Sequence, residues 1–138
     1  MRRTLILLTP LLLAGCIKDS ATYYIAEDSN DHVITVRAEQ EYFWDQTLTL
    51  TLVASRMPDC LRRFPMASVA SAEDLAVELF AAGENVYSVR SGTELIQVET
   101  QGCTQLAAPA PNALGEPVGV FHFGGERMSF DKAAAPQG

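Results

Sequence analysis

The chain has 138 residues, with ten Lys and Arg against seventeen Asp and Glu, and its formal net charge is −7 at neutral pH. A chain of this length holds one domain with a hydrophobic core, not two. Its acidic balance gives no general electrostatic attraction for nucleic acid or for anionic lipid head groups, so we expect no nucleic-acid partner.

The first sixteen residues have the pattern of an export signal. Two arginines precede an apolar run over residues 5–13, which is far shorter than the ~20 apolar residues of a membrane-spanning helix. The run leads into Leu13-Ala14-Gly15-Cys16, which resembles the lipobox of bacterial lipoproteins at all four positions. The resemblance implies cleavage before Cys16, attachment of diacylglycerol to its thiol and acylation of its new amine.

The same resemblance implies a location. Three acyl chains anchor a protein stably, whereas a single chain binds membranes only marginally. In lipoproteins of this class, aspartate after the cysteine commonly signals retention in the inner membrane. Ile17 occupies that position, which implies the periplasmic face of the outer membrane, with the inner membrane as the alternative. The membrane is thus the first expected partner, through the acyl chains on Cys16.

Two cysteines remain once Cys16 is lipidated, and they are Cys60 and Cys103. Because the periplasm is oxidising, an even pair there is most simply a disulfide. A redox pair usually shows Cys-x-x-Cys, and a zinc site needs more ligands at closer spacing. Loss of the signal peptide also leaves eight basic against seventeen acidic side chains, a net charge of −9.

Alternating hydrophobicity predicts strands along the rest of the chain. The clearest run is Thr47–Val53, in which leucines and threonines would occupy opposite faces of a half-buried strand. Segment Ser71–Gly83 is ambiguous, because it has helical spacing with a capping-box pattern and also period-2 alternation, and we prefer the strand. The other expected strands are Thr22–Ala26 at an edge, Val33–Arg37, Met66–Val69, Val86–Arg90, Thr93–Thr100, and a closing hairpin of Val118–Phe123 and Glu126–Phe130.

Two segments are expected as loops, Arg62–Pro65 and the Ala- and Pro-rich Leu106–Pro117. These elements predict an all-β fold, either an antiparallel sandwich or a small barrel, with about seven short strands and one disulfide. The expected organisation is a cleaved signal peptide at 1–15, a lipid-anchored tether at 16–31, a single β domain at 32–131 and a disordered tail at 132–138.

The sequence contains few candidates for catalytic or metal-binding residues. Neither His32 nor His122 has a second metal ligand at a useful spacing, and the chain has no nucleophile, zinc-helix, phosphate-loop or dinucleotide motif. The acidic segment Glu27–Asp31 lacks the glycine and the distal glutamate of a calcium loop, and it is typical of a solvated segment. We therefore expect no enzyme, no cofactor and no metal site.

The segment from Arg56 to Arg63 is the best candidate for recognition. Arg56, Arg62 and Arg63 gather near Cys60 in an otherwise acidic protein, and guanidinium groups suit a carboxylate or phosphate. The alternative is pairing with neighbouring acids such as Asp59. The expected function is a non-enzymatic interaction or structural module that binds an unidentified envelope protein. The alternative function is a small-ligand carrier with a pocket among Tyr42, Phe43, Trp44 and the aromatic residues of the sheet.

Overall fold

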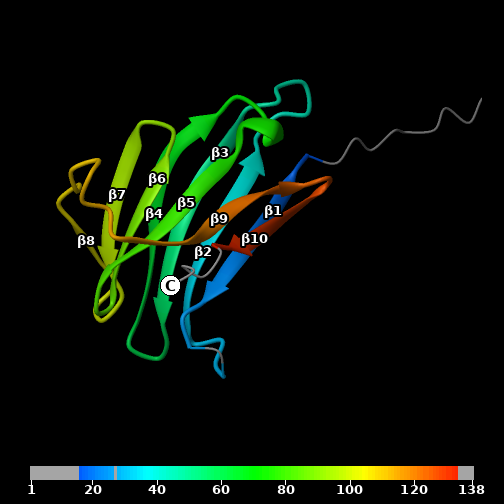
Figure 1. Cartoon of the computed structure of the whole chain (residues 1–138). Coiled ribbons are helices and arrows are strands. Elements are labelled where there is room, and N and C mark those ends of the chain that lie inside the picture. The colour runs from blue at the N-terminus through cyan, green and yellow to red at the C-terminus, as the bar shows by residue number, and fades with distance from the viewer. Residues whose placement is uncertain (1–15, 27, 134–138) are drawn as a thin grey trace, which may run out of the picture.

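The computed structural model describes residues 16–26 and 28–133 of the chain. The expected signal peptide at 1–15 lies outside these residues, as do Glu27 and residues 134–138. The described part forms two antiparallel sheets, of four and six strands (Figure 1). The smaller sheet contains, in spatial order, β1 (Lys18–Tyr24), β2 (His32–Gln40), β3 (Leu48–Arg56) and β4 (Cys60–Val69). The larger sheet contains β10 (Arg127–Lys132), β9 (Glu116–Gly124), β5 (Ala76–Gly83), β6 (Val86–Ser91), β7 (Glu94–Glu99) and β8 (Thr104–Leu106).

Strand β3 confirms the firmest sequence prediction. Leu48, Leu50 and Leu52 are completely buried, whereas Thr49 is exposed and Thr51 is half-buried. This alternation is expected for a strand with one face on the core and the other toward solvent. The same period places inner residues of β2 opposite these leucines, with Val36 beside Leu52 and Ala38 beside Leu50.

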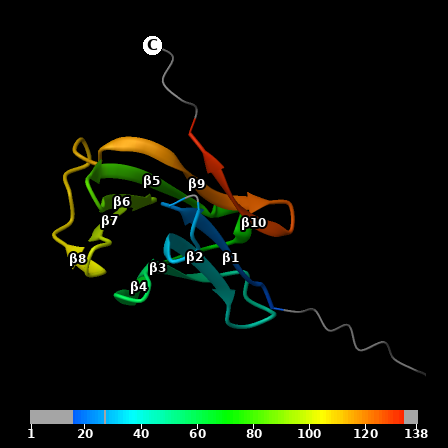
Figure 2. The ribbon, with the colours of Figure 1, turned by 90° about the horizontal axis from the view of Figure 1, so that it is seen from below.

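The core lies between the two sheets, which form separate layers when viewed from below (Figure 2). Its completely buried members come from both layers and are mostly branched aliphatics, as expected for facing strands. The smaller sheet contributes Ile34, Val36, Leu48, Leu50 and Leu52, and the larger sheet contributes Val77, Leu79, Val89, Val98 and Phe121. The prediction of an all-β sandwich is confirmed, and the two sheets are not closed into a barrel.

The sheets touch along one side through β1 and β10. The carboxylate of Asp19 accepts the backbone N–H of Met128 at 2.9 Å. The ring of Tyr23 packs against Phe130, with centroids 5.1 Å apart, and approaches Tyr87 at 6.3 Å. These contacts fix the first strand of the described chain against the last.

Several sequence expectations need correction. Within the expected tether, the edge strand predicted at Thr22–Ala26 is present but runs from Lys18 to Tyr24. It pairs with β2 along its whole length, so the sheet begins two residues after Cys16. The expected loop Arg62–Pro65 lies within β4, and β8 was missed. Ten strands are present in the described residues instead of about seven. Strand β10 also extends to Lys132, into the expected tail.

Other expectations are confirmed. The ambiguous segment Ser71–Gly83 contains a three-residue 3-10 turn, η1 (Ala72–Asp74), followed by strand β5. The closing hairpin is formed by β9 and β10. Within residues 16–26 and 28–133, no helix is long and apolar enough to cross a membrane.

Candidate functional site

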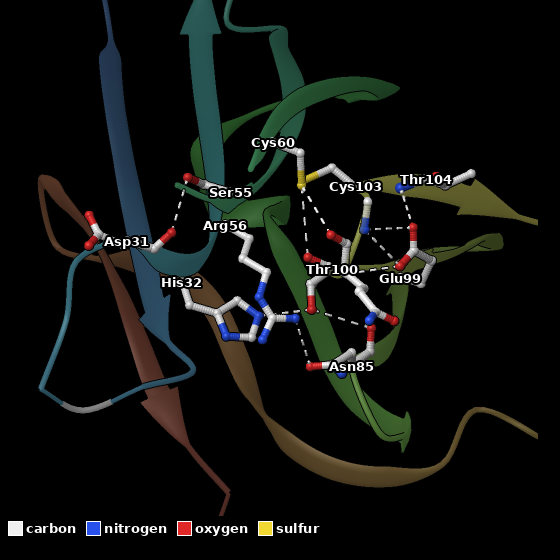
Figure 3. Close-up of a disulfide and its surroundings, with 12 residues drawn as sticks. Asp31, His32, Ser55, Arg56, Cys60, Asn85, Glu99, Thr100, Cys103 and Thr104 are labelled. Carbon is white, nitrogen blue, oxygen red and sulfur yellow. Dashed lines mark hydrogen bonds between the residues drawn. A yellow bond between two sulfur atoms is a disulfide. The ribbon is translucent and has the colours of Figure 1, made fainter. Parts of the chain in front are cut away.

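A disulfide joins the two sheets at one end of the sandwich. Cys60 begins β4 and Cys103 precedes β8, and their Cα atoms lie 5.9 Å apart across a sequence separation of 43 residues (Figure 3). This distance is within the range that a disulfide bridges without moving the backbone. The predicted pairing is confirmed.

A carboxylate shapes the loop that carries Cys103. The side chain of Glu99 accepts backbone N–H groups of Gln101 at 2.9 Å, Gly102 at 3.0 Å and Thr104 at 3.0 Å (Figure 3). These hydrogen bonds, that of Gly102 first, lower the pKa of Glu99. They hold the turn in which Cys103 adopts a φ of 53°, a conformation that non-glycine residues seldom adopt.

Two hydrogen bonds cross between the sheets beside the disulfide. His32 Nε2 lies 2.8 Å from the hydroxyl of Thr100, and Arg56 Nη1 donates to Asn85 Oδ1 at 3.4 Å (Figure 3). The backbone N–H of the completely buried Thr100 donates to the carbonyl of Asn85 at 2.8 Å. This end of the sandwich is therefore held by one covalent and two polar links.

The surroundings of His32 disfavour the protonated, positively charged form of its ring. Burial first, and then the Arg56 guanidinium beside its ring (Figure 3), lower the pKa of His32. The ring is thus held in the neutral form at neutral pH. Sequence reasoning placed no role on His32, because its partners come from distant turns of the chain.

The predicted recognition residues lie on a hairpin that we call the arginine hairpin, residues Arg56–Arg63. Its turn is fixed by backbone bonds, from Met57 N–H to Asp31 O at 2.9 Å and from Asp59 N–H to Arg56 O at 2.8 Å. Met57 exposes 47% and Leu61 50% of their surfaces. Methionine and arginine are among the residues enriched at protein interfaces.

The three arginines are presented in different ways. Arg56 is tied to Asn85, whereas Arg62 and Arg63 are exposed and, as neighbours on a strand, point to opposite faces of β4. The Arg62 guanidinium lies 5.6 Å from the centre of the Phe64 ring. The structure therefore brings the three residues onto one hairpin without converging them on a single point.

The expected alternative, pairing with acids such as Asp59, is not formed. Ion pairs in the described part of the chain include Lys18–Glu39, Arg37–Glu39, Arg90–Glu78 and His122–Asp131, and none of these involves Asp59 or the arginine hairpin. Arg62 and Arg63 thus present their charges to solvent.

The aromatic residues that the ligand-carrier hypothesis placed in a pocket are on the surface instead. Tyr42, Phe43 and Trp44 expose 47%, 67% and 69% of their surfaces in the loop between β2 and β3. An open depression of about 380 Å³ lies elsewhere, on the outer face of the larger sheet, where Arg90 pairs with Glu78. The expected contribution of Tyr42, Phe43 and Trp44 to a pocket is therefore wrong, whereas the sheet aromatics Tyr23 and Phe130 line a separate open depression.

The remaining candidate groups are scattered. Among the residues described, no group of three or more His, Cys, Asp and Glu side chains is placed to hold a metal ion. His122 lies on the outer face of β9, paired with Asp131 and 3.4 Å from the hydroxyl of Ser129. Cys16 is exposed, with a free thiol, at the start of the described chain.

Comparison of the chain with protein-family models, with curated proteins and with solved structures gives no match. Function is therefore argued from the geometry and the sequence of this chain.

Proposed function

We propose that this chain is a lipid-anchored protein of the bacterial cell envelope, at the periplasmic face of the outer membrane, and that it is a non-enzymatic module that binds another envelope protein. The interaction role is supported by one observation: the arginine hairpin presents exposed apolar and cationic side chains together on a rigid support.

Rigidity supports a binding role because a preorganised surface loses less conformational entropy on association. The disulfide and the hydrogen bonds of His32 and Arg56 brace both sides of the hairpin. Met57 and Leu61 supply apolar contact area, and Arg62 and Arg63 supply charge. The partner is therefore a protein surface with acidic side chains around an apolar centre.

Charge would also select the partner. The mature chain has a net charge of −9, so the chain as a whole repels an acidic protein, whereas the arginine hairpin holds three arginines against one acid, Asp59. Complementary charge at an interface mainly raises the association rate and fixes orientation. Binding through this hairpin should accordingly weaken as salt increases.

Site-specific photo-crosslinking in the native envelope tests the interaction. A photoreactive residue at Leu61 should give one defined protein adduct, whereas the same residue at the exposed Thr49 should not. Arg62→Glu with Arg63→Glu should remove the adduct. Arg127→Glu, a matched charge reversal on the exposed start of β10, should leave it unchanged. An adduct that survives the double reversal, or equal adducts at both positions, would overturn the role of the hairpin.

The anchor is tested separately with Cys16→Ser. Since only a thiol can form the thioether, this variant should remain unprocessed or be released as a soluble protein. The parent protein should gain the mass of its acyl chains and stay with membranes through a high-salt wash. Normal processing and membrane retention of the variant would refute the lipoprotein assignment.

A further inference from the structure

The loop between β2 and β3 carries three adjacent aromatic residues whose rings pack on each other instead of on the core. Tyr42 and Trp44 are stacked with ring centroids 4.8 Å apart, and Phe43 meets Trp44 edge-on at 4.9 Å. Each exposes about half of its surface or more, up to 69% for Trp44. We call residues Tyr42–Trp44 the aromatic loop. So much exposed aromatic surface in one place marks an interaction site.

The aromatic loop is a fixed feature. The side-chain amide of Gln40 donates to the carbonyl oxygens of Tyr42 at 3.0 Å and Asp45 at 2.8 Å. The Asp45 N–H donates to the Tyr42 carbonyl at 3.1 Å, and the Thr47 N–H donates to the Asp45 carboxylate at 3.0 Å. These hydrogen bonds fix the backbone of the loop on both sides of the aromatic residues. The backbone in turn keeps the three rings directed toward solvent.

The same glutamine places the loop beside the start of the mature chain. The Gln40 N–H donates to the Ile17 carbonyl at 2.8 Å, and the Ile17 N–H donates to Gln40 Oε1 at 3.2 Å. Ile17 also lines an open depression together with Gln40 and Gln46. The aromatic loop and the start of β1 accordingly lie at the same, upper end of the sandwich in Figure 1.

Cys16 directly precedes Ile17, and consecutive Cα atoms are about 3.8 Å apart. Acyl chains on Cys16 would therefore draw this end of the domain to the bilayer, without a tether to hold it away. The interfacial layer on each side of a bilayer is roughly 5–8 Å thick. Tryptophan and tyrosine concentrate in that layer, where an apolar ring and a polar group are both satisfied.

Charge selects the kind of lipid surface. Glu41 and Asp45 flank the aromatic residues and are exposed, and Glu39 is near Lys18 at 3.9 Å and Arg37 at 3.4 Å. A loop with this charge has no attraction for anionic head groups. Its affinity would come from the rings, so a zwitterionic surface suits it better.

We propose that Tyr42, Phe43 and Trp44 insert into the interface of the membrane that holds the acyl chains of Cys16. This inference rests on the lipid anchor of the proposed function. It sets the orientation of the domain: the aromatic loop lies at the bilayer, and the disulfide end, with its arginine hairpin, faces away. The nine residues of β2 separate the two ends by about 26 Å, at ~3.3 Å per residue.

The chain contains a single tryptophan, so the fluorescence of Trp44 reports on the loop directly. Lipidated protein is reconstituted into phosphatidylcholine vesicles, with attachment verified by mass and flotation. Trp44 emission should shift to shorter wavelength relative to the soluble Cys16→Ser protein, and lipids brominated near the head group should quench it strongly.

A matched control moves the reporter to the opposite end. In Trp44→Phe with Tyr24→Trp, the tryptophan replaces an aromatic that is 49% exposed at the end of β1, and brominated lipid should barely quench it. Equal quenching at both positions, or unquenched Trp44 in protein that floats with vesicles, would overturn the proposed orientation while leaving the anchor intact. Protein that carries no acyl chains would instead refute the anchor.

The preference for a zwitterionic surface is tested with vesicles that contain anionic lipid. Phosphatidylglycerol should not increase the burial of Trp44 in the bilayer, and an increase would contradict the zwitterionic preference.

Discussion

His32 and Thr100 are joined by a side-chain hydrogen bond of 2.8 Å across the two sheets, although 68 residues separate them in the chain. His32 begins β2 and Thr100 follows β7, so the bond ties the first half of the chain to the second. Because His32 also faces Arg56, a titratable group controls one of the contacts that close the disulfide end.

Acidification should therefore weaken the fold. The pKa of His32 is lowered in the folded state, first by burial and then by Arg56, so the unfolded chain binds a proton more readily. Its contribution to stability is present above about pH 6.5, the ordinary histidine pKa, and is lost as the pH falls below that value. Urea unfolding at pH 7.5 and 5.5 should show a lower free energy of unfolding at pH 5.5. His32→Gln should flatten this dependence, and Arg56→Gln should reduce it. If the free energy of unfolding of His32→Gln falls by the same amount between pH 7.5 and 5.5, another group is responsible for the pH dependence.

Removal of the disulfide should cost much of the stability. Closure of a loop of 43 residues contributes roughly 4 kcal/mol by the chain-entropy estimate. Cys60→Ser with Cys103→Ser should lower the free energy of unfolding by up to that amount, measured by urea at pH 7.5. The oxidised mature protein should show no titratable thiol apart from an unmodified Cys16. Two further thiols in the oxidised protein would contradict the pairing.

The alternating burial along β3 predicts that substitutions at the adjacent residues Leu50 and Thr49 have very different effects on stability. Leu50→Asp places a charge at a completely buried position and should cost several kcal/mol, comparable with the stability of a small domain. Thr49→Asp changes an exposed side chain on the other face and should be tolerated. Circular dichroism and thermal melting of both variants distinguish them, and equal damage would mean that both faces of β3 are buried.

Gly119 is required by the approach of the neighbouring strand. A Cβ at this position would lie 2.3 Å from the Asp131 carbonyl oxygen and 2.4 Å from Phe130 Cζ. Gly119→Ala should thus destabilise the β9–β10 hairpin by roughly 1–3 kcal/mol, the usual cost of overpacking. Gly124→Ala is the matched control in the same strand, because its nearest contact is an ordinary 3.6 Å to Ser129 Oγ. Similar melting temperatures for the two variants would refute the steric argument.

The strands predicted from sequence are those whose faces differ in burial. Leu48, Leu50 and Leu52 alternate with threonines, and the same contrast identified the strand in Ser71–Gly83. The missed or misplaced strands β1, β4 and β8 are all edges of their sheets. An edge strand has one neighbour and tolerates polar residues and proline, such as Pro65 in β4, so its sequence carries a weak pattern.

The candidate site was predictable only in part. The even number of cysteines left after Cys16, together with the expected oxidising compartment, sufficed to pair Cys60 with Cys103. The contacts of His32 with Thr100 and of Arg56 with Asn85 depend on which turns the topology brings together, and no local pattern encodes that. Tyr42, Phe43 and Trp44 were misplaced because exposed and buried aromatic clusters have the same composition.

The short distance from Cys16 to β1 also determines how the domain would bear mechanical force. If the chain is anchored through Cys16 as proposed, a partner that pulls on the arginine hairpin would load the protein along its strands, against an attachment two residues before Lys18. Antiparallel hydrogen bonds run perpendicular to the strands, so the seven paired residues of β1 would resist together, in shear, instead of opening one at a time. At the far end, the disulfide divides the force between the two sheets. Under the proposed anchoring through Cys16 and binding at the arginine hairpin, the domain would act as a stiff spacer between the membrane and its partner.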